Sequence, residues 1–512
     1  MLFHEPIFLY AFLPATLAAF LVLQSYGATA GAAWLLLMSS MLFYGWWDPR
    51  LLPLLAASIT FYYLFGLVLV RRAASKSNIL LALGIASNLG LLGFFKYADF
   101  ALSTLNDALG TSAPLLDLPL PLAISFFTFL QIAFLVDCSK QELRSPLFID
   151  YALFVSYFPH LVAGPLVHHS ELIPQFRRKI CPAETWENLS VGSTIFIIGL
   201  AKKTLLASPA GSYSDKLFDA VAAGATPTFI EAWPGVLGFA FQIYFDFSAY
   251  SDMAIGISRM FGIWLPVNFA SPYKATSIVD FWRRWHITLS RFLRDYLYVP
   301  LGGSRRGIGR RYLNLILVML LGGAWHGAGW TFILWGGLHG LLLAASHAWR
   351  DARGRSMTGG HQMSKWIWRP LVFATVVLLW VPFRADSLGT TISIWQGMLG
   401  LHGFVLPEHY AQIGRIGSLE SLGIRFSAVP LYAGGWQLVD LATACAIVWF
   451  CPNTQEIMRN YRPALGTDRT VQHWAPAWRP GLVLAVATGL FACFLFALTL
   501  QKKPGEFIYF QF

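Results

Sequence analysis

The chain has 512 residues, of which 56% are hydrophobic and 12% are charged. Soluble domains carry about 25% charged residues, so this composition excludes an ordinary water-soluble protein. A net charge of +11 would suggest a nucleic-acid partner in a soluble protein. In a membrane protein the same excess lies in short loops and meets anionic lipid head groups, so we expect the lipid bilayer as a partner and no nucleic acid.

The first apolar run, residues 7–23, has no basic segment before it and no small-residue cleavage site after it. We therefore expect a retained membrane span and not a removed signal peptide. The five cysteines form no CxxC pair and no Cys/His spacing typical of a metal site. This pattern predicts no disulfide framework, no metal site and no bound cofactor.

Apolar runs long enough to cross about 30 Å of hydrocarbon recur over nearly the whole chain. Two of them are unusual, because 119–137 opens with Pro119 and Pro121 and 312–325 is too short to cross without tilting. Either can be a re-entrant element surrounded by protein or water. The sequence predicts an all-α, polytopic membrane protein with about 11–13 transmembrane or re-entrant helices in a single domain, residues 1–512. The expected spans are 7–25, 29–47, 51–70, 79–95, 119–137, 147–167, 188–208, 228–247, 312–325, 329–347, 367–383, 435–451 and 480–500.

The first strongly basic loop contains Arg71, Arg72 and Lys76, whereas the loop 48–50 is nearly neutral. The positive-inside rule places this basic loop in the cytoplasm. Three crossings precede it, so the N-terminus is expected outside.

The segment 280–299 differs from the spans around it. On one continuous helix its arginines share one face, and its tryptophans and most of its leucines share the opposite face. This pattern predicts an amphipathic helix that lies in the membrane interface with a basic face. His286 falls on the apolar side, near Leu293 and Leu297, so its ring is expected to point into protein or bilayer.

A histidine ends the apolar run 313–321, in the sequence Gly322-Gly323-Ala324-Trp325-His326-Gly327. A polar ring at membrane depth is costly and is a functional hypothesis by default. Burial disfavours imidazolium, so His326 is expected to be neutral and able to accept a proton from a hydroxyl group, as a general base does. The alternative is a structural hydrogen bond between helices, and spacing alone leaves both open.

Other polar groups in apolar surroundings are expected to be structural. His339 would lie about 20 Å from His326 on an unbroken helix, too far for a catalytic pair. Asp246 and Asp252 resemble an acid/base or cation pair, but an Asp that holds a helix terminus or pairs with a nearby arginine is more common. The chain contains no GxSxG, Walker or HExxH motif, so serine-nucleophile, nucleotide-hydrolysis and zinc-peptidase functions have no support.

Several segments together resemble the membrane-bound O-acyltransferase family and, within it, the subfamily of bacterial alginate O-acetyltransferase membrane subunits. The resemblance is strongest over residues 40–400, and 400–512 resembles the C-terminal spans of the alginate type. One departure is Asp137-Cys138-Ser139-Lys140, where relatives have an Asp followed by a tyrosine-containing turn. The matching segments are 43–49 (FYGWWDP), 94–97 (FFKY), 124–129 (ISFFTF), 157–165 (YFPHLVAGP), 244–254 (YFDFSAYSDMA), 281–290 (FWRRWHITLS), 322–327 (GGAWHG), 383–385 (FRA) and 506–512 (EFIYFQF).

This resemblance implies an O-acyltransferase in a bacterial inner membrane, with His326 as the essential catalytic residue and His286 as the second, supporting histidine. It implies a ring of tilted helices around a thinned centre, with a tunnel in which a cytoplasmic acyl donor, such as acetyl-CoA, meets the acceptor. The arginines of 283–311 would attract an anionic donor. The expected acceptor is an exported polysaccharide, alginate first, or a periplasmic acetyltransferase partner that acetylates it.

Other functions stay open at this point. Within the family, the chain could be a D-alanyltransferase or an O-acyltransferase for peptidoglycan or another polysaccharide. A transporter or flippase with a histidine proton relay is an alternative of a different class. We find no internal repeat and no paired charges inside the spans, which disfavours transport.

Overall fold

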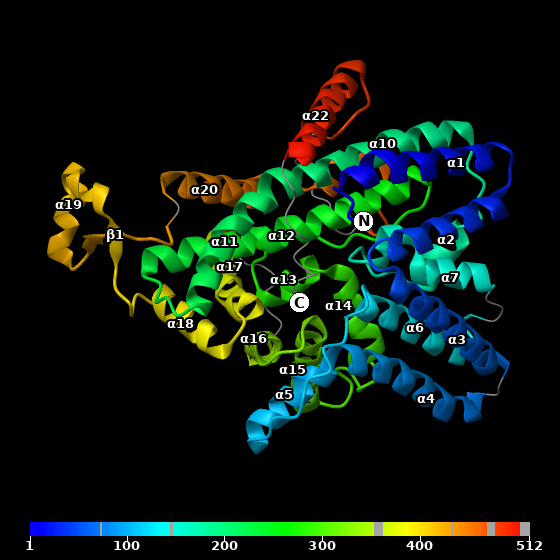
Figure 1. Cartoon of the computed structure of the whole chain (residues 1–512), viewed down its shortest axis with the longest axis horizontal. Coiled ribbons are helices and arrows are strands. Elements are labelled where there is room, and N and C mark those ends of the chain that lie inside the picture. The colour runs from blue at the N-terminus through cyan, green and yellow to red at the C-terminus, as the bar shows by residue number, and fades with distance from the viewer. Residues whose placement is uncertain (72–73, 144–146, 353–361, 433, 468–476, 502–512) are drawn as a thin grey trace. The chain divides into compact units, whose positions relative to one another are not determined.

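The computed structural model in Figure 1 describes residues 1–71, 74–143, 147–352, 362–432, 434–467 and 477–501. Arg72 and the segment 506–512, which contributed to the sequence interpretation, lie outside these residues. Nearly all regular structure in the described part is helical, so the predicted all-α class is confirmed. The one small exception is a pair of three-residue parallel strands, β1 (Val405–Pro407) and β2 (Arg425–Ser427).

Within the described ranges, seven helical segments are long and apolar enough to cross a membrane. Three shorter apolar helices, Thr29–Gly45, Ile124–Ser139 and Gly435–Phe450, accompany them. The chain is therefore a multi-pass membrane protein, as its composition predicts. The seven segments are Phe8–Ser25, Pro49–Arg71, Asn78–Leu109, Pro182–Ala222, Trp330–Ala352, Lys365–Arg384 and Leu482–Gln501.

Some predicted spans have different boundaries in the structure. The expected helix 119–137 begins only at Ile124, after the two prolines. The expected span 147–167 is wrong as a single helix, because the helix from Phe148 ends at Ser156 and Tyr157 leaves the helical region with φ −54° and ψ 111°. Only one further turn, Phe158–Leu161, follows. The short element 312–325 extends to Ile308–His326, because polar residues add a turn before the apolar run.

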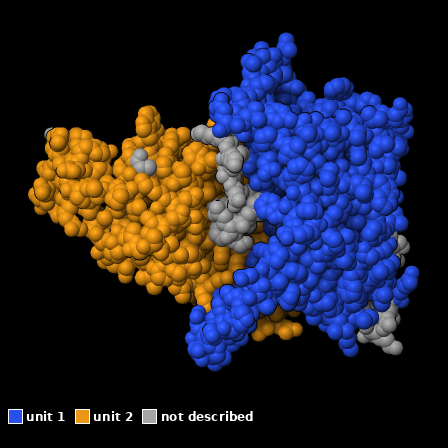
Figure 2. Space-filling view, in the orientation of Figure 1, with its two compact units in different colours: residues 1–200, 249–268, 454–504 blue, residues 201–248, 269–453, 505–512 orange. Residues whose placement is uncertain are grey.

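The contacts within the chain divide it into two compact units, drawn in different colours in Figure 2. Unit 1 comprises residues 1–200, 249–268 and 454–504, and unit 2 comprises 201–248, 269–453 and 505–512. The helix α12 (Phe229–Met260) contributes residues to both. Both units are discontinuous in sequence, so composition along the chain could not indicate this division.

Unit 1 contains the N-terminal helices and the C-terminal apolar helix. Its short helices α7, α8 and α9 connect the apolar helix α6 to the long helix α10. The helices are α1 (Leu13–Ser25), α2 (Thr29–Gly45), α3 (Leu52–Arg71), α4 (Ala74–Leu92), α5 (Ala98–Leu109), α6 (Ile124–Ser139), α7 (Phe148–Ser156), α8 (Phe158–Leu161), α9 (His169–Leu172), α10 (Pro182–Ala201), α21 (Thr454–Ile457) and α22 (Leu482–Gln501).

Unit 2 contains all three of the histidines that the sequence analysis singled out. Its helices are α11 (Ser208–Ala222), the first part of α12, α13 (Ile278–Arg284), α14 (Ile287–Leu293), α15 (Ile308–His326), α16 (Trp330–Ala352), α17 (Gln362–Arg384), α18 (Leu388–Met398), α19 (Gly414–Gly417) and α20 (Gly435–Phe450).

Helices α15 and α16 pack with their backbones in direct contact. A Cβ atom on Gly323 would lie 2.3 Å from the carbonyl oxygen of Phe332, and one on Gly336 would lie 2.3 Å from that of Met319. Only glycine fits such an approach, which is how small residues bring membrane helices together. The chain reverses between the two helices over residues 327–329, so the segments before and after the reversal lie side by side.

Candidate active site

His326 is the last residue of α15 and is 6% exposed. The helix ends there because Gly327 takes an extended conformation, φ −157° and ψ 152°. Three aromatic rings surround the imidazole, with centroid distances of 4.9 Å to Trp325, 5.2 Å to Trp335 and 5.1 Å to Phe383. The imidazole is therefore packed among aromatic side chains of α15, α16 and α17.

His286 lies between α13 and α14 and is fully buried. Its backbone is left-handed, φ 43° and ψ 54°, so the predicted continuous helix over 280–299 is wrong. The prediction failed because α13 ends at Arg284 and a new helix starts after this residue, a break that hydrophobic periodicity does not reveal. The predicted direction of the His286 ring, into the apolar interior, is confirmed.

Aromatic side chains also surround His286. Its ring meets Phe247 edge to face at 4.7 Å and lies 6.5 Å from Trp325 between centroids. Trp325 therefore contacts both predicted site histidines. Burial lowers the pKa of His286 to about 3, so this ring is neutral at physiological pH.

The rings around the two histidines continue into a larger aromatic core of unit 2. Trp335 stacks on Trp380 at 5.9 Å, and Trp380 lies 4.9 Å from Trp285. The indole Nε1 of Trp380 donates to the hydroxyl of Tyr273 at 3.1 Å, and that hydroxyl donates to the carbonyl oxygen of Ala240 at 2.6 Å. Satisfied polar groups of this kind hold the rings in one arrangement and keep the site pre-organised.

His339 is fully buried in α16 and closer to the site than predicted. The expected separation of about 20 Å assumed an unbroken helix, but the chain reverses after His326. The ring of His339 is 4.9 Å from Trp335, the same tryptophan that contacts His326. Its Nδ1 accepts a hydrogen bond from the indole Nε1 of Trp282 at 3.2 Å. This bond supports the predicted structural role.

The two aspartates on α12 have separate partners and do not form a catalytic pair. Asp246 makes an ion pair with Lys203 at 2.8 Å, and both side chains are buried. Asp252 accepts hydrogen bonds from Thr454 Oγ1 at 2.6 Å and Gln455 Nε2 at 3.4 Å. Asp246 thus has a basic partner, a lysine in place of the expected arginine, and Asp252 has uncharged donors. The expectation of no paired charges inside the spans is wrong, because Lys203 and Asp246 lie in the expected spans 188–208 and 228–247.

Unit 1 contains a histidine group that the sequence analysis missed. His168 Nε2 and His169 Nδ1 lie 3.2 Å and 2.8 Å from the same carboxylate oxygen of Asp137. The three potential ligand atoms all lie within 4.8 Å of one another, and these residue types are able to hold a metal ion. Asp137 is about 30 positions away in the sequence from the two histidines. The adjacent His pair was the only available signal, and its partner follows from the fold.

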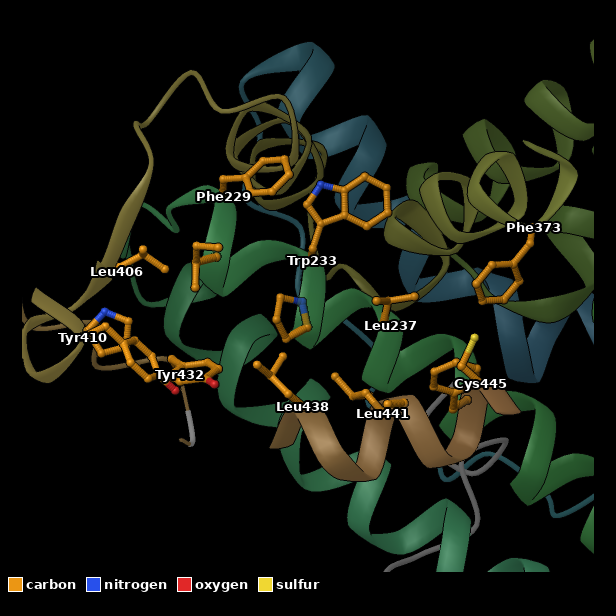
Figure 3. A pocket seen from close by; sticks show the side chains of 15 residues that line it. Phe229, Trp233, Leu237, Phe373, Leu406, Tyr410, Tyr432, Leu438, Leu441 and Cys445 are labelled. Carbon is orange, nitrogen blue, oxygen red and sulfur yellow. The ribbon is translucent and has the colours of Figure 1, made fainter. Parts of the chain in front are cut away.

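A separate apolar pocket of about 420 Å³ lies in unit 2 between α12, α17 and α20 (Figure 3). Phe229, Trp233, Leu237, Leu438 and Leu441 point into it. The hydroxyl groups of Tyr410 and Tyr432 lie close together at one end. This pocket has no histidine or carboxylate in its lining, so it offers no imidazole or carboxylate as a general base.

Comparison with known proteins gives a family for this chain. The sequence profile described as "MBOAT, membrane-bound O-acyltransferase family" matches residues 41–379, a range that includes His286 and His326. A peptidoglycan O-acetyltransferase of Helicobacter pylori is 44% identical over 434 residues, covering 79% of this chain and 81% of the relative.

Two further relatives bear on the choice of substrate. A probable alginate O-acetylase of Pseudomonas aeruginosa is 34% identical over the full length of both chains. A teichoic acid D-alanyltransferase of Streptococcus thermophilus is 26% identical and covers only 44% of this chain and 57% of the relative. The predicted resemblance to the family and to the alginate-type proteins is confirmed.

Proposed function

Because this chain belongs to the membrane-bound O-acyltransferase family, and so is an O-acyltransferase, we propose that it transfers an acetyl group to an exported polysaccharide. The donor is a thioester on the cytoplasmic side of a bacterial inner membrane, possible donors including acetyl-CoA. The immediate acceptor is a hydroxyl group of the polysaccharide or of a periplasmic partner protein that acetylates it. Family membership also sets aside the transporter alternative.

The observation that carries this proposal is the environment of His326. It is a buried imidazole at the end of a helix, inside the range that matches the family, and it is walled by Trp325, Trp335 and Phe383. Such a wall excludes water, which would otherwise hydrolyse a thioester. A neutral imidazole has a ring nitrogen that is able to accept the proton of a hydroxyl group, as a general base does.

In the proposed reaction, His326 accepts the proton of the acceptor hydroxyl while its oxygen attacks the thioester carbonyl carbon. The tetrahedral intermediate then collapses, the carbon–sulfur bond breaks, and the thiolate takes the proton back from His326. The products are an acetyl ester and a free thiol, and the histidine is restored. General-base catalysis of this kind contributes about 10²–10⁴-fold, and the positioning of donor and acceptor supplies much of the remainder.

His286 is proposed to support this step as a neutral ring. It shares the contact with Trp325 and faces the same aromatic core. Its left-handed backbone, φ 43°, is an uncommon conformation for a side-chain-bearing residue and is typical of functional positions.

The comparisons support two polymers, and we propose peptidoglycan as the first to test. The Helicobacter pylori peptidoglycan enzyme shares 44% identity with this chain, compared with 34% for the alginate protein of Pseudomonas aeruginosa. Alginate is the second candidate, because that relative matches over the full length of both chains. A D-alanyl donor is less well supported, because the match to the D-alanyltransferase is partial.

The experiment is acetate analysis of polymers from cells that lack their own O-acetyltransferase and express this chain. Mass spectrometry of muropeptides and of alginate measures ester-linked acetate on each polymer. The proposal predicts acetate on one polymer with the wild-type chain and none with His326→Ala at equal expression. Equal acetate in wild-type and vector-only cells, on both polymers, would contradict it.

A further inference from the structure

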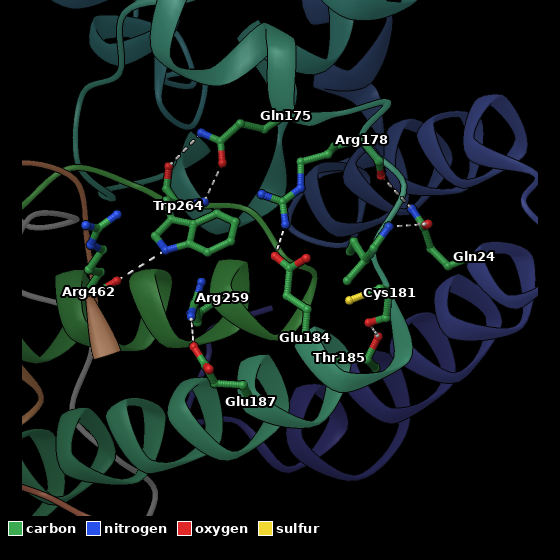
Figure 4. Close-up of polar contacts among 11 residues, drawn as sticks. Gln24, Gln175, Arg178, Cys181, Glu184, Thr185, Glu187, Arg259, Trp264 and Arg462 are labelled. Carbon is green, nitrogen blue, oxygen red and sulfur yellow. Dashed lines mark hydrogen bonds and ion pairs between the residues drawn. The ribbon is translucent and has the colours of Figure 1, made fainter. Parts of the chain in front are cut away.

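Unit 1 contains a polar pocket of about 630 Å³ that the proposed acyl-transfer chemistry does not use (Figure 4). Its lining includes three guanidinium groups, those of Arg178, Arg259 and Arg462, and one carboxylate, that of Glu187. Arg178 is also paired with Glu184, and Arg259 is paired with Glu187. These three arginines and two glutamates carry one net positive charge, in contrast to the uncharged aromatic site of unit 2.

Arg259 is the most informative side chain of this pocket. It is 3% exposed, and one of its terminal nitrogens donates to Glu187 at 2.9 Å. Its Nε and Nη1 are buried and have no hydrogen-bond partner among the described residues. Buried donors of a charged group are almost always satisfied, and leaving them unpaired is costly. They indicate that a ligand with acceptor oxygens completes the site.

The indole of Trp264 holds two of the guanidinium groups in place. Arg259 lies over the ring at 4.0 Å from its centroid and Arg178 at 4.9 Å. Gln175 fixes this tryptophan, since its Oε1 accepts from the backbone N–H of Trp264 at 2.8 Å and its Nε2 donates to the carbonyl oxygen at 3.1 Å. Figure 4 shows the two hydrogen bonds between Gln175 and the backbone of Trp264, and the ion pairs of Arg178 with Glu184 and of Arg259 with Glu187.

The wall that carries Arg462 is also anchored. The indole Nε1 of Trp264 donates to the carbonyl oxygen of Arg462 at 3.2 Å. The backbone N–H of Val267 donates to the carbonyl oxygen of Leu465 at 3.0 Å, and the backbone N–H of Leu465 donates to the carbonyl oxygen of Leu265 at 2.9 Å. These hydrogen bonds hold the backbone of the wall, while the side chains of Arg178 and Arg462 are exposed and that of Arg259 is buried. Arg259 is therefore the fixed part of the site, and the other two guanidinium groups lie at its rim.

Local contacts place the pocket on the side that the topology predicts to be cytoplasmic. Gln24, near the end of α1, donates to the carbonyl oxygen of Arg178 at 3.3 Å. The basic loop at Arg71 predicts that the N-terminus lies outside the cell membrane. One membrane crossing, α1, separates the N-terminus from Gln24, so Gln24 and the pocket are expected on the cytoplasmic side.

We propose that this pocket binds the phosphate group of an anionic ligand on the cytoplasmic side. Guanidinium groups recognise phosphate through paired N–H donors, and three of them around one pocket exceed what a single carboxylate ligand requires. A phosphate-bearing acyl donor and a phospholipid head group share this chemistry. Binding of an acyl donor in this pocket rests on the proposed function. Binding of a phosphate group there does not depend on that function.

The test is equilibrium dialysis of the purified full-length chain in detergent with radiolabelled inorganic pyrophosphate at low ionic strength. Arg178→Gln and Arg462→Gln should each weaken binding about tenfold, the loss expected for a charge-assisted hydrogen bond. Arg50→Gln is the matched control, because Arg50 is an exposed arginine of the same unit, paired with Asp48. It should bind like the wild type. Both pocket variants leave Arg259 intact, and elution as a single size-exclusion peak confirms that they fold.

Competition identifies the source of the phosphate. Displacement of pyrophosphate by coenzyme A supports a soluble donor, and displacement by vesicles rich in phosphatidic acid supports a lipid head group. The proposal is overturned if the wild type does not bind millimolar pyrophosphate, if Arg178→Gln and Arg462→Gln bind it as tightly as the wild type does, or if neither competitor displaces it. Binding is also measured in His326→Ala, which should be unaffected. Intact binding in a wild-type chain without acyl transfer would refute the proposed function and leave the phosphate site standing.

Discussion

Two regions of this molecule hold groups of histidines, and their surroundings are opposite in kind. In unit 2, His286 and His326 are packed against aromatic rings. In unit 1, His168 and His169 converge on the carboxylate of Asp137. A carboxylate partner fixes the tautomer and orientation of an imidazole, whereas an aromatic wall excludes water and leaves the ring to react with a bound substrate. The difference favours proton transfer in unit 2 and a structural role in unit 1.

The largest expected effect follows from replacing His326. His326→Ala should lower acetyl transfer by at least about a hundredfold, because it removes the general base. Ester-linked acetate per molecule of folded enzyme is the measurement. His402→Ala is a matched control, since His402 is a half-buried histidine of the same unit whose Nδ1 contacts the carbonyl oxygen of Pro227 at 3.0 Å. If His326→Ala and His402→Ala lost acetyl transfer equally, His326 would have no special role in the reaction.

Asp137→Asn should act on stability and not on chemistry. The substitution leaves two histidine nitrogens facing an uncharged amide in a buried place, which we expect to cost about 3 kcal/mol. Thermal unfolding in detergent should show a lower midpoint. Transfer per folded molecule should match the wild type, and a selective loss of transfer would mean that the group in unit 1 takes part in the reaction.

His286→Asn should lower kcat about tenfold with little change in KM, because a supporting residue acts on the reacting step. Asparagine is the chosen replacement because it tolerates the left-handed backbone that His286 adopts, φ 43°. A change of KM alone would place His286 in binding and not in the support of His326.

His339→Gln should change transfer by less than about threefold. The amide oxygen of glutamine is able to accept the hydrogen bond that Trp282 donates to Nδ1. The ring of His339 is linked to His326 through the shared neighbour Trp335. A loss as large as that of His326→Ala would show that both histidines contacting Trp335 take part in the reaction.

Acid should destabilise unit 2 through His286. The unfolded chain binds a proton at this residue below its ordinary pKa of 6.5, whereas burial lowers the pKa in the folded state to about 3. The stability contributed here is therefore present above pH 6.5 and falls as the pH drops from 6.5 towards 3. As the pH falls through this range, the thermal unfolding midpoint should fall less steeply in His286→Asn than in the wild type. Equal slopes of midpoint against pH in the two proteins would show that His286 is not the source of the acid sensitivity.

Much of the candidate site could be predicted from the sequence, because charge is scarce in this chain. His326 ends an almost purely apolar run, so its polar ring stands out without any knowledge of the fold. The inward direction of His286 was also predictable from helical periodicity, although its helix breaks at that residue.

The rest depends on contacts between distant residues, which no spacing reveals. The reversal over residues 327–329 brings Trp335 to His326, and His339 lies one turn further along the same helix as Trp335. The fold brings His168 and His169 to Asp137. Arg178, Arg259 and Arg462 reach one pocket from three separate segments. In each case the backbone geometry and the packing of the helices determine which side chains are in contact. Hydrophobic periodicity predicts neither the geometry nor the packing.

The comparison between the two histidine regions can be tested directly with purified protein and a radiolabelled acetyl thioester. Release of the labelled acetyl group to a glycan acceptor would be followed for the wild type, His326→Ala and His169→Ala, each corrected for folded enzyme. We predict no transfer above the enzyme-free rate for His326→Ala and transfer within about threefold of the wild type for His169→Ala. Wild-type transfer by His326→Ala would contradict the central claim that His326, the buried histidine among the aromatic rings of unit 2, is the catalytic base.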